Sequence, residues 1–175
     1  ANLSSLAFDP AEHHGVELVD TSVDPTFTVP SDASTTDYLF SIKDRDNSEK
    51  WWVFDSLNGL TNYTSFDATT AQTPDATTLS VSTTTITMGA AFASSNYLVE
   101  WWRAGETSGS GTSGPPADIT SSVSVNTTSG FTIVLWTQDG AASGPWTVGH
   151  GLGTALDMLI TKNLDTAWSS DWAVW

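Results

Sequence analysis

The sequence predicts an all-β fold, built as a sandwich or a barrel of antiparallel strands. Short runs of alternating and β-branched residues recur along the chain, and Gly, Pro, Asn, Asp or Ser bound each run. Those five residue types tolerate the backbone geometry of turns, so each run indicates one strand. No segment carries an apolar repeat of the helical period beyond one or two turns. Many short strands at regular spacing are typical of sandwiches and barrels.

The expected strands follow one another with one long interruption. They span residues 15–19, 26–29, 37–43, 51–55, 78–88, 96–102, 121–126, 130–136, 157–162 and 172–175. The interruption, residues 103–120, is rich in Gly, Ser and Pro and almost free of apolar residues, as exposed loops and linkers are. We therefore expect a first β module over 1–104, a linker or loop over 105–118 and a second, apparently truncated β repeat over 119–175.

Composition and charge exclude several kinds of partner. The net charge is −15, from 20 acidic and 5 basic residues, and such a surface repels nucleic acid and anionic lipid. The chain has no cysteine, which excludes disulfides, thiolate metal sites and thiol nucleophiles. No stretch approaches the roughly 18 apolar residues of a membrane-spanning helix, and the N-terminus lacks the pattern of a signal peptide. We expect neither nucleic acid nor a membrane as a partner.

Two stretches of the chain follow the same plan. Residues 26–54 and 145–175 align so that Lys43 falls on Lys162 and, after one insertion, Trp52 falls on Trp172. Upstream, GVELVDTS from Gly15 matches GFTIVLWT from Gly130 in its apolar alternation. Where the second copy has GHGLG, the first has PSDAS. A phosphate cradle or a catalytic turn would be expected in both copies, so we interpret GHGLG as a bend that leads into a strand.

This interpretation gives structural turn roles to Gly149, His150, Gly151 and Gly153. Glycine supplies positive φ or lets the backbone approach a neighbouring strand closely. A phosphate loop would require a helix after the glycines, whereas the following DMLITK indicates a strand. His150 has no partner in the sequence that would orient it as a base. We expect no catalytic residue in this turn.

The C-terminal part of the chain also resembles a known family. The stretch WWRAGE…ITSSVSVNTTSGFTIVLWTQDG…WTVGHGLGTALDMLITKN is similar to a repeat in tail-associated and other virion proteins of tailed bacteriophages, especially marine ones. The family pattern runs aromatic-Lys-Ala-Gly-Gly, Ile-x-Ser-x-Val-Ser-x-Asn, Ala-Gly-Phe-Ser-Ile-Val and Val-Gly-His-Gly-Leu-Gly-x-Ala-Pro. An apolar run, Lys-Asn-Arg and a polar loop that ends in Trp follow. The match is close over residues 101–175 and looser over the preceding module.

The chain departs from the family pattern at four positions. Leu156 stands where the family has proline, and Leu164 stands where it has arginine. Arg103 and Glu106 replace the lysine and the second glycine of the family. These changes loosen the turn and remove a surface charge, and they affect no catalytic role.

The resemblance implies an antiparallel, jelly-roll-like β-sandwich in a non-enzymatic structural protein of a phage particle. Such a protein would be a tail-fibre, spike or decoration component that acts in particle assembly and in host-surface attachment. The implied partners are other virion proteins, further copies in a homo-oligomer and a host surface glycan, and the implied location is the virion, an extracellular particle. The alternative is a secreted carbohydrate-binding module that stacks glycans on exposed tryptophans.

One loop is a candidate cation site, although no cofactor is otherwise expected. In DRDNSE, Asp44, Asp46 and Ser48 fall at alternating positions, as in calcium loops. Glu49 stands where an EF-hand loop requires glycine, so an EF-hand is excluded. A looser surface Ca²⁺ site remains as an alternative to a solvated hairpin loop.

The tryptophans are the candidate binding residues. Trp51-Trp52 and Trp101-Trp102 are adjacent on expected strands, so one ring of each pair should face the core and the other should face outward. Outward-facing aromatic rings serve sugar-binding surfaces and oligomer interfaces alike, and we favour the interface. Core positions are expected for Trp52 and Trp172. The candidate binding or interface residues are Trp51, Trp101, Trp102, Trp136 and Trp175.

Two further candidate sites are weaker. A glycan hydrolase would need two carboxylates that flank a cleft, and the many aspartates single out no such pair. Glu100, between strand aromatics in LVEWW, would be the first candidate. His13 and His14 lack a third metal ligand at any usual spacing.

The second copy ends after WAVW, whereas residues 56–103 add further strands to the first copy. A sandwich without those strands would expose an apolar face and an unpaired edge. We expect the first module, a neighbouring subunit or a longer chain to complete it, and we favour the last two. Trp172, Val174 and Trp175 should then be buried only in an assembly or in a longer chain.

Overall fold

The predicted all-β, antiparallel fold is confirmed. The computed structural model describes residues 9–34, 37–92, 95–105, 107–111, 119, 121–137, 147–165 and 170–175. These residues form strands, turns and loops, with one short 3₁₀ helix, η1 (Pro10–Glu12). Within this described part of the chain, no helix has the length and apolar content needed to span a membrane.

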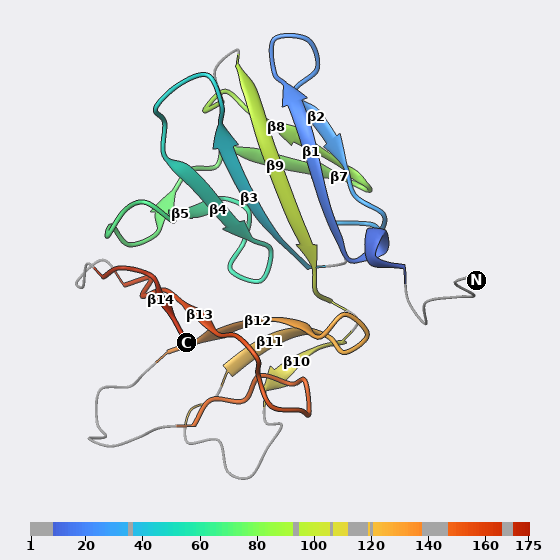
Figure 1. Ribbon diagram of the computed structural model, residues 1–175, viewed down its shortest axis with the longest axis vertical. Helices are drawn as coiled ribbons and strands as arrows, with labels where there is room; N and C mark the ends of the chain where they lie inside the picture. Colours follow the sequence, from blue (N-terminus) through green and yellow to red (C-terminus); the bar gives the residue numbers. More distant parts are fainter. Residues whose placement is uncertain are drawn as a thin grey trace, which may run out of the picture.

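Two antiparallel sheets form the first unit, residues 9–105 (Figure 1). The larger sheet contains, in spatial order, β1 (His14–Asp20), β9 (Asn96–Arg103), β3 (Tyr38–Asp44), β4 (Trp51–Asp55), β5 (Asn62–Ser65) and β6 (Thr73–Pro74). The smaller sheet contains β2 (Thr26–Thr28), β8 (Thr85–Met88) and β7 (Leu79–Ser82). β9 is the longest strand of the larger sheet, and it pairs with β1 on one side and with β3 on the other.

The core of the first unit lies between these two sheets. Alternation along β3 and β9 turns every second side chain toward the smaller sheet, which makes a β-sandwich. The Phe27 ring of β2 packs edge-on against the Phe40 ring of β3, 5.6 Å between centroids. The largest fully buried apolar side chains of this core are Tyr38, Tyr97, Phe27, Phe40, Phe54, Ile42, Ile86 and Val99.

The second unit, residues 107–175, holds the remaining strands. β10 (Thr107–Gly111), β11 (Ser121–Asn126) and β12 (Phe131–Trp136) form an antiparallel three-stranded sheet. β13 (Ile160–Thr161) and β14 (Ala173–Val174) form a short antiparallel hairpin. A parallel bridge joins Ile119 to Val148. Figure 1 shows that this unit lies against one end of the first unit, with β12 on the side that faces it.

Hydrogen bonds connect the two units. Buried Asn126 donates through Nδ2 to His13 Nδ1, at 2.8 Å, and to the backbone oxygen of Arg103, at 3.2 Å. At the other side, the Trp172 indole N–H donates to the backbone oxygen of Ser65, at 2.7 Å. Lys162 Nζ donates to the backbone oxygen of Ala68, at 3.0 Å. The second unit is therefore held at two separated points of the first.

Two expectations about the backbone are corrected. The run 78–88 is a hairpin of β7 and β8, in which Thr83 has a φ of +52°, and not one strand. Ser and Thr suit both strands and turns, so the turn left no mark in the alternation. Part of the expected linker forms β10, which pairs with β11, because backbone groups form a ladder whatever the side chains. Residues 106 and 112–118 of that linker lie outside the described residues.

Candidate functional site

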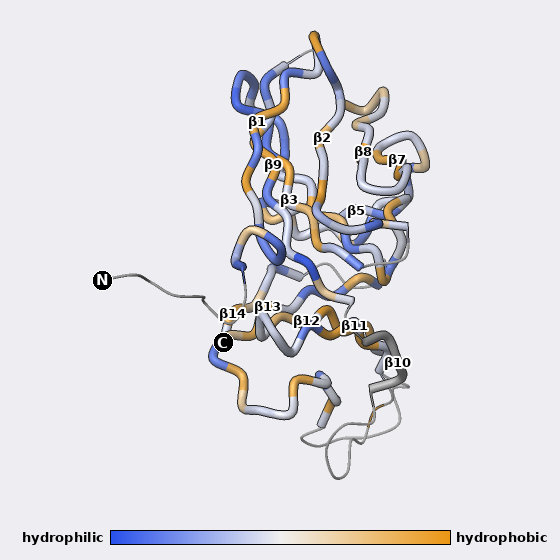
Figure 2. Tube along the Cα trace, turned by 90° about the vertical axis from the view of Figure 1, so that its right-hand side faces the viewer, coloured by the Kyte–Doolittle hydropathy of each residue, from blue (hydrophilic) through white to orange (hydrophobic). Residues whose placement is uncertain are grey.

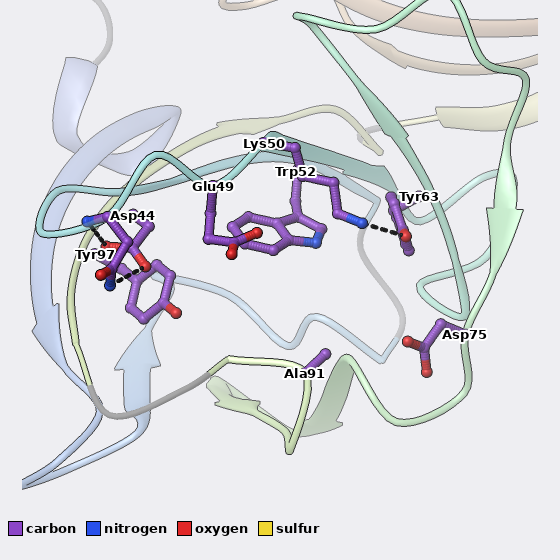
Figure 3. A pocket seen from close by; sticks show the side chains of 9 residues that line it. Asp44, Glu49, Lys50, Trp52, Tyr63, Asp75, Ala91 and Tyr97 are labelled. Atoms are coloured by element: carbon purple, nitrogen blue, oxygen red, sulfur yellow. Dashed lines mark hydrogen bonds between the residues drawn. The ribbon is translucent and has the colours of Figure 1, made fainter.

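One end of the first sandwich holds a polar pocket of about 410 Å³, here called the mouth pocket (Figure 3). It lies where β3 ends and where β4 and β9 begin. Figure 3 shows Glu49 beside the Trp52 ring and Asp75 at the opposite side. The residues that line it are Asp44, Asn47, Glu49, Lys50, Trp52, Tyr63, Asp75, Ala91 and Tyr97.

The aromatic rings of the mouth pocket are already covered. Trp52 is 4% exposed and Tyr97 is 1% exposed. Lys50 Nζ lies 5.6 Å from the Trp52 ring and 4.6 Å from the Tyr63 ring, and it donates to the Tyr63 hydroxyl at 2.7 Å. A pyranose needs an open indole or phenol face to stack on, and this pocket offers little of one.

The candidate cation loop is held together by its own hydrogen bonds. The Asp44 carboxylate accepts from the backbone N–H groups of Asp46 and Asn47, from the Asn47 side chain and from the Ser95 hydroxyl, at 2.8–3.0 Å. Asp46 accepts from the backbone and side chain of Asn96 at the start of β9. The loop is thereby fixed to β9. Calcium binding here stays a prediction, and the described residues contain no cluster of three or more Asp, Glu, His or Cys arranged for a metal.

These hydrogen bonds lower the pKa values of the two aspartates of the loop, Asp44 and Asp46. Burial raises the pKa of Asp44, but the bonds from Asn47, Asp46 and Ser95 together outweigh it, so its pKa lies below the ordinary value of 3.8. The bonds from Asn96 likewise lower the pKa of Asp46, against smaller opposing effects of burial and of the Asp44 charge. Both side chains are therefore carboxylates at neutral pH and act as acceptors.

The alternation predicted for the two tryptophan pairs is confirmed. Trp52 and Trp101 are buried in the core, and Trp51 and Trp102 lie half-buried on the opposite face of the sheet. Trp101 is therefore corrected as a candidate binding residue: it is 5% exposed because its side chain lies on the face of β9 that packs into the core, against the Tyr38 ring.

The outer tryptophans differ in accessibility. The indole N–H of Trp51 donates to the Ser41 hydroxyl, and the Trp51 ring packs edge-on against Phe66. The centroid of the Trp102 ring lies 5.1 Å from that of His14. Trp136 is 38% exposed and Trp175 is 79% exposed, so these two remain open for contacts.

The sequence predicts a core position for Trp172. This prediction is corrected, because Trp172 is half-buried and lies against the first unit instead of in a core of its own unit. Its ring packs 4.9 Å from that of Phe66 at the end of β5. The first unit therefore covers part of it, in contrast to Val174, which is 64% exposed. The expectation that Trp172 needs an assembly or a longer chain to be covered is corrected to this extent.

The GHGLG stretch is a turn in which the backbone makes the contacts. Gly151 and Gly153 have φ angles of +80° and +73°. The carbonyl of Gly149 accepts from Ser121 Oγ at 2.8 Å, and that of His150 accepts from Thr132 Oγ1 at 2.9 Å. His150 Nδ1 faces its own turn, 3.4 Å from the N–H of Leu152. The turn anchors the chain to β11 and β12.

A second hollow, here called the interunit groove, lies between the first unit and the second and has a volume of about 490 Å³. Leu39, Val53, Thr64 and Phe66 of the larger sheet form one wall. β12 and residues 152–164, which include β13, form the other walls. Figure 2 shows hydrophobic stretches along β12 and near β13 at this junction.

The interunit groove is lined mainly by apolar side chains, and several stay open to solvent. They are Phe66 at 37% exposure, Trp136 at 38%, Leu156 at 38%, Leu159 at 40%, Ile160 at 48% and Met158 at 63%. Trp175 lies beside them, because its backbone N–H and C=O bond to those of Leu159. Exposed apolar patches of this kind mark interaction surfaces. Sequence reasoning named only Trp136 and Trp175 among them; the signal it missed was the apolar run 156–160 after the turn.

Two acidic residues line the groove: Asp157, which is exposed, and Asp55, which is half-buried. Burial raises the pKa of Asp55, a backbone hydrogen bond from Asn58 opposes this, and the charge of Asp37 adds to the rise, so the pKa lies above the ordinary 3.8. The groove is therefore unfavourable for an anion and suited to apolar groups.

The fold and these hollows define an antiparallel β-sandwich protein with a second, partly open β unit. The chain belongs to the family described as a domain of unknown function, DUF7483, whose model matches residues 16–175. That match spans both units. No curated protein and no solved structure matches the chain.

Proposed function

We propose that this protein is a non-enzymatic structural component of a tailed-phage particle: a tail-fibre, spike or decoration module that acts in assembly. The GFTIVLW…VGHGLG…ITKN resemblance supports the phage context. The observation that carries the assembly role is the set of open apolar side chains along the interunit groove, which includes Leu156, Met158, Leu159 and Ile160. An apolar surface of this extent is stabilised by covering it with another protein surface.

The two hollows differ in what they can do chemically. The carboxylates of Asp44 and Asp46 are already used as hydrogen-bond acceptors, by their own loop and by Asn96 of β9, and Lys50 lies over the Trp52 ring. The interunit groove instead offers apolar side chains next to the edge of β12, which pairs with no strand but β11 among the residues that the structure describes. Protein–protein contact fits that combination better than catalysis or small-ligand binding does.

The test is the location of the protein in infected cultures. Particles purified through a density gradient are analysed by mass spectrometry and labelled with an antibody raised against the 175-residue chain. We expect the protein in the particle fraction at a fixed ratio to the other virion proteins, with label on the tail or the surface. Recovery solely from the soluble lysate, with unlabelled particles, would contradict the proposal.

Glycan binding is the second candidate, and the exposed ring of Trp175 is the observation that favours it. An indole that is 79% exposed presents a face on which a pyranose ring can stack. A glycan array probed with the wild-type chain and with Trp175→Ala tests this. Signal that disappears in Trp175→Ala would support glycan binding, and an array without signal would leave assembly as the sole proposal.

A further inference from the structure

The interunit groove has the position of a missing strand. In the first unit, β9 lies between β1 and β3 and pairs antiparallel with both along its length. By the internal repeat, β12 corresponds to β1 and β13 corresponds to β3. In the described part of the chain, β12 pairs only with β11 and β13 pairs only with β14, yet both strands line the same groove. The groove therefore lies where the counterpart of β9 would run.

A pair of corresponding glycines supports this position. Gly15 begins the alternation of β1, and a Cβ added there would lie 2.4 Å from the ring of Trp101 on β9. Gly130 holds the matching position in the alignment, in the turn before β12 with a φ of +72°; it lines the groove, and a Cβ added there would meet no atom of the described residues within 4 Å. A β9 tryptophan thus packs on Gly15, whereas the described part of the chain leaves the aligned Gly130 open toward the groove.

The hairpins confirm that the two units are comparable in structure. β3–β4 and β13–β14 are both antiparallel hairpins, with registers that differ by one residue in the alignment. Lys43 on β3 donates through Nζ to the backbone oxygen of Glu49 in its hairpin loop. The aligned Lys162 donates in the same way to the backbone oxygen of Ser170. β13 is thus the structural counterpart of β3.

We infer that the interunit groove binds an extended strand of the β9 type, supplied by another repeat unit of this family. The strand pairs antiparallel with the free edge of β12 and with β13, covers Leu156 to Ile160, and places a tryptophan next to Gly130. Strand addition to an open edge gives affinity through the backbone and specificity through alternate side chains. The inference rests on the assembly function proposed above for the source of that strand.

The β9 strand of a second copy is not free for this role. Its inward side chains Tyr97, Val99 and Trp101 are at most 5% exposed in the core of the first unit. Release of β9 would open that core. The occupant is therefore a β9-type strand whose own unit does not need it, and strand exchange between two 175-residue chains is an alternative outcome of the test.

The probe is a fluorescent synthetic peptide with the sequence of residues 95–105, SNYLVEWWRAG, titrated with the full chain. We expect saturable 1:1 binding by fluorescence anisotropy. A peptide with Trp101→Ala should bind at least about tenfold more weakly, because a buried aromatic anchor dominates such contacts. Hydrogen exchange of the complex should slow at β12 and β13 and stay unchanged at β1.

Matched protein variants locate the site. Met158 lines the groove and Leu18 lies on β1 of the first unit, and both are 63% exposed, so lysine at either position leaves the fold intact. Met158→Lys should weaken peptide binding at least about tenfold, and Leu18→Lys should leave it unchanged. A peptide that does not bind, that binds both variants equally, or that instead produces dimers of the chain would overturn the inference. Peptide binding by a chain absent from phage particles would refute the proposed function alone.

Discussion

The two units of this protein use the same strand plan and differ in how far it is closed. In the first unit, β9 fills the centre of the larger sheet and the β2–β8–β7 sheet covers it, so that Phe40, Ile42 and Val99 are fully buried. In the described residues of the second unit, no strand lies between β12 and the β13–β14 hairpin in the way that β9 does, and Ile160 and Val174 are 48% and 64% exposed. Alternation of apolar residues, which the strands of both units share, is therefore not enough to bury their side chains. Burial depends on the strand and the sheet that complete each unit.

The largest expected effect is a difference in the stability lost when an apolar side chain is truncated in each of the two units. Phe40→Ala removes a fully buried ring from the first core and should lower the free energy of unfolding by about 3–5 kcal/mol. Ile160→Ala removes a half-exposed side chain and should cost about 1 kcal/mol or less. Urea denaturation followed by tryptophan fluorescence measures both. Equal losses would mean that the second unit buries Ile160 as well as the first buries Phe40.

The next effect concerns the GHGLG turn, which is anchored to β11 and β12. Gly151→Ala forces a residue with a side chain into a φ of +80°, at a cost of about 1–2 kcal/mol, and its Cβ would lie 2.4 Å from Val125 Cγ2. Gly153→Ala has a similar φ of +73° but open space around the added Cβ. Thermal unfolding should therefore show a larger loss for Gly151→Ala. A larger loss at Gly153 would contradict the close packing of the turn on β11.

A smaller effect is the pH-dependent contribution of two aspartates to the free energy of unfolding. It has opposite signs for Asp44, at the end of β3, and Asp55, at the end of β4. The lowered pKa of Asp44 means that its carboxylate adds stability above pH 3.8, which is lost as the pH falls through the lower folded value. The raised pKa of Asp55 means that its charge costs stability above the folded pKa, a cost that disappears as the pH falls below 3.8.

At pH 7, Asp44→Asn should therefore destabilise the protein and Asp55→Asn should stabilise it, since asparagine can still accept the bond from Asn58. Both differences should shrink in acid, which denaturation at pH 7 and at pH 3 would measure. Two changes of the same sign at pH 7 would contradict the assigned environments.

The smallest expected effect is at the histidine of the turn. The His150 side chain accepts a long bond, 3.4 Å, from the backbone N–H of Leu152 in its own turn, and the closer bond from Thr132 goes to the His150 backbone oxygen. Asparagine tolerates unusual turn dihedrals and offers an acceptor, so His150→Asn should leave unfolding and particle incorporation nearly unchanged. Loss of function in a folded His150→Asn variant would show that the side chain has a chemical role.

Much of the fold could be predicted because alternation is a local signal. It located β4 and β11 to the residue and β1, β3, β9 and β12 within one residue, and it predicted that one tryptophan of each pair faces inward, naming Trp52 for the first pair but neither residue for the second. It missed β5, β6 and β10, because they are short and contain mainly Ser, Thr, Gly, Asn or Pro, which turns also use. Alternation predicted a strand over 157–162, whereas β13 contains only Ile160 and Thr161. The other residues of that run have no partner strand in the described part of the chain and so form no ladder.

The interunit groove could not be predicted, because its walls come from β4, β5, β12 and β13, which are distant in the sequence. The aligned glycines could have suggested it, but only the structure shows that Trp101 covers Gly15 and that no described residue covers Gly130. Which side chains meet across two units depends on how those units pack, and alternation within each strand does not contain that information.

Hydrogen–deuterium exchange on the isolated 175-residue chain, followed segment by segment, tests the central claim most directly. A closed first unit and an open second unit predict strong protection of β3 and β9, with much faster exchange at β12 and in the β13–β14 hairpin. Protection of β12, β13 and β14 as strong as that of β9 in the monomeric chain would contradict the account, because the second unit would then be complete without another strand.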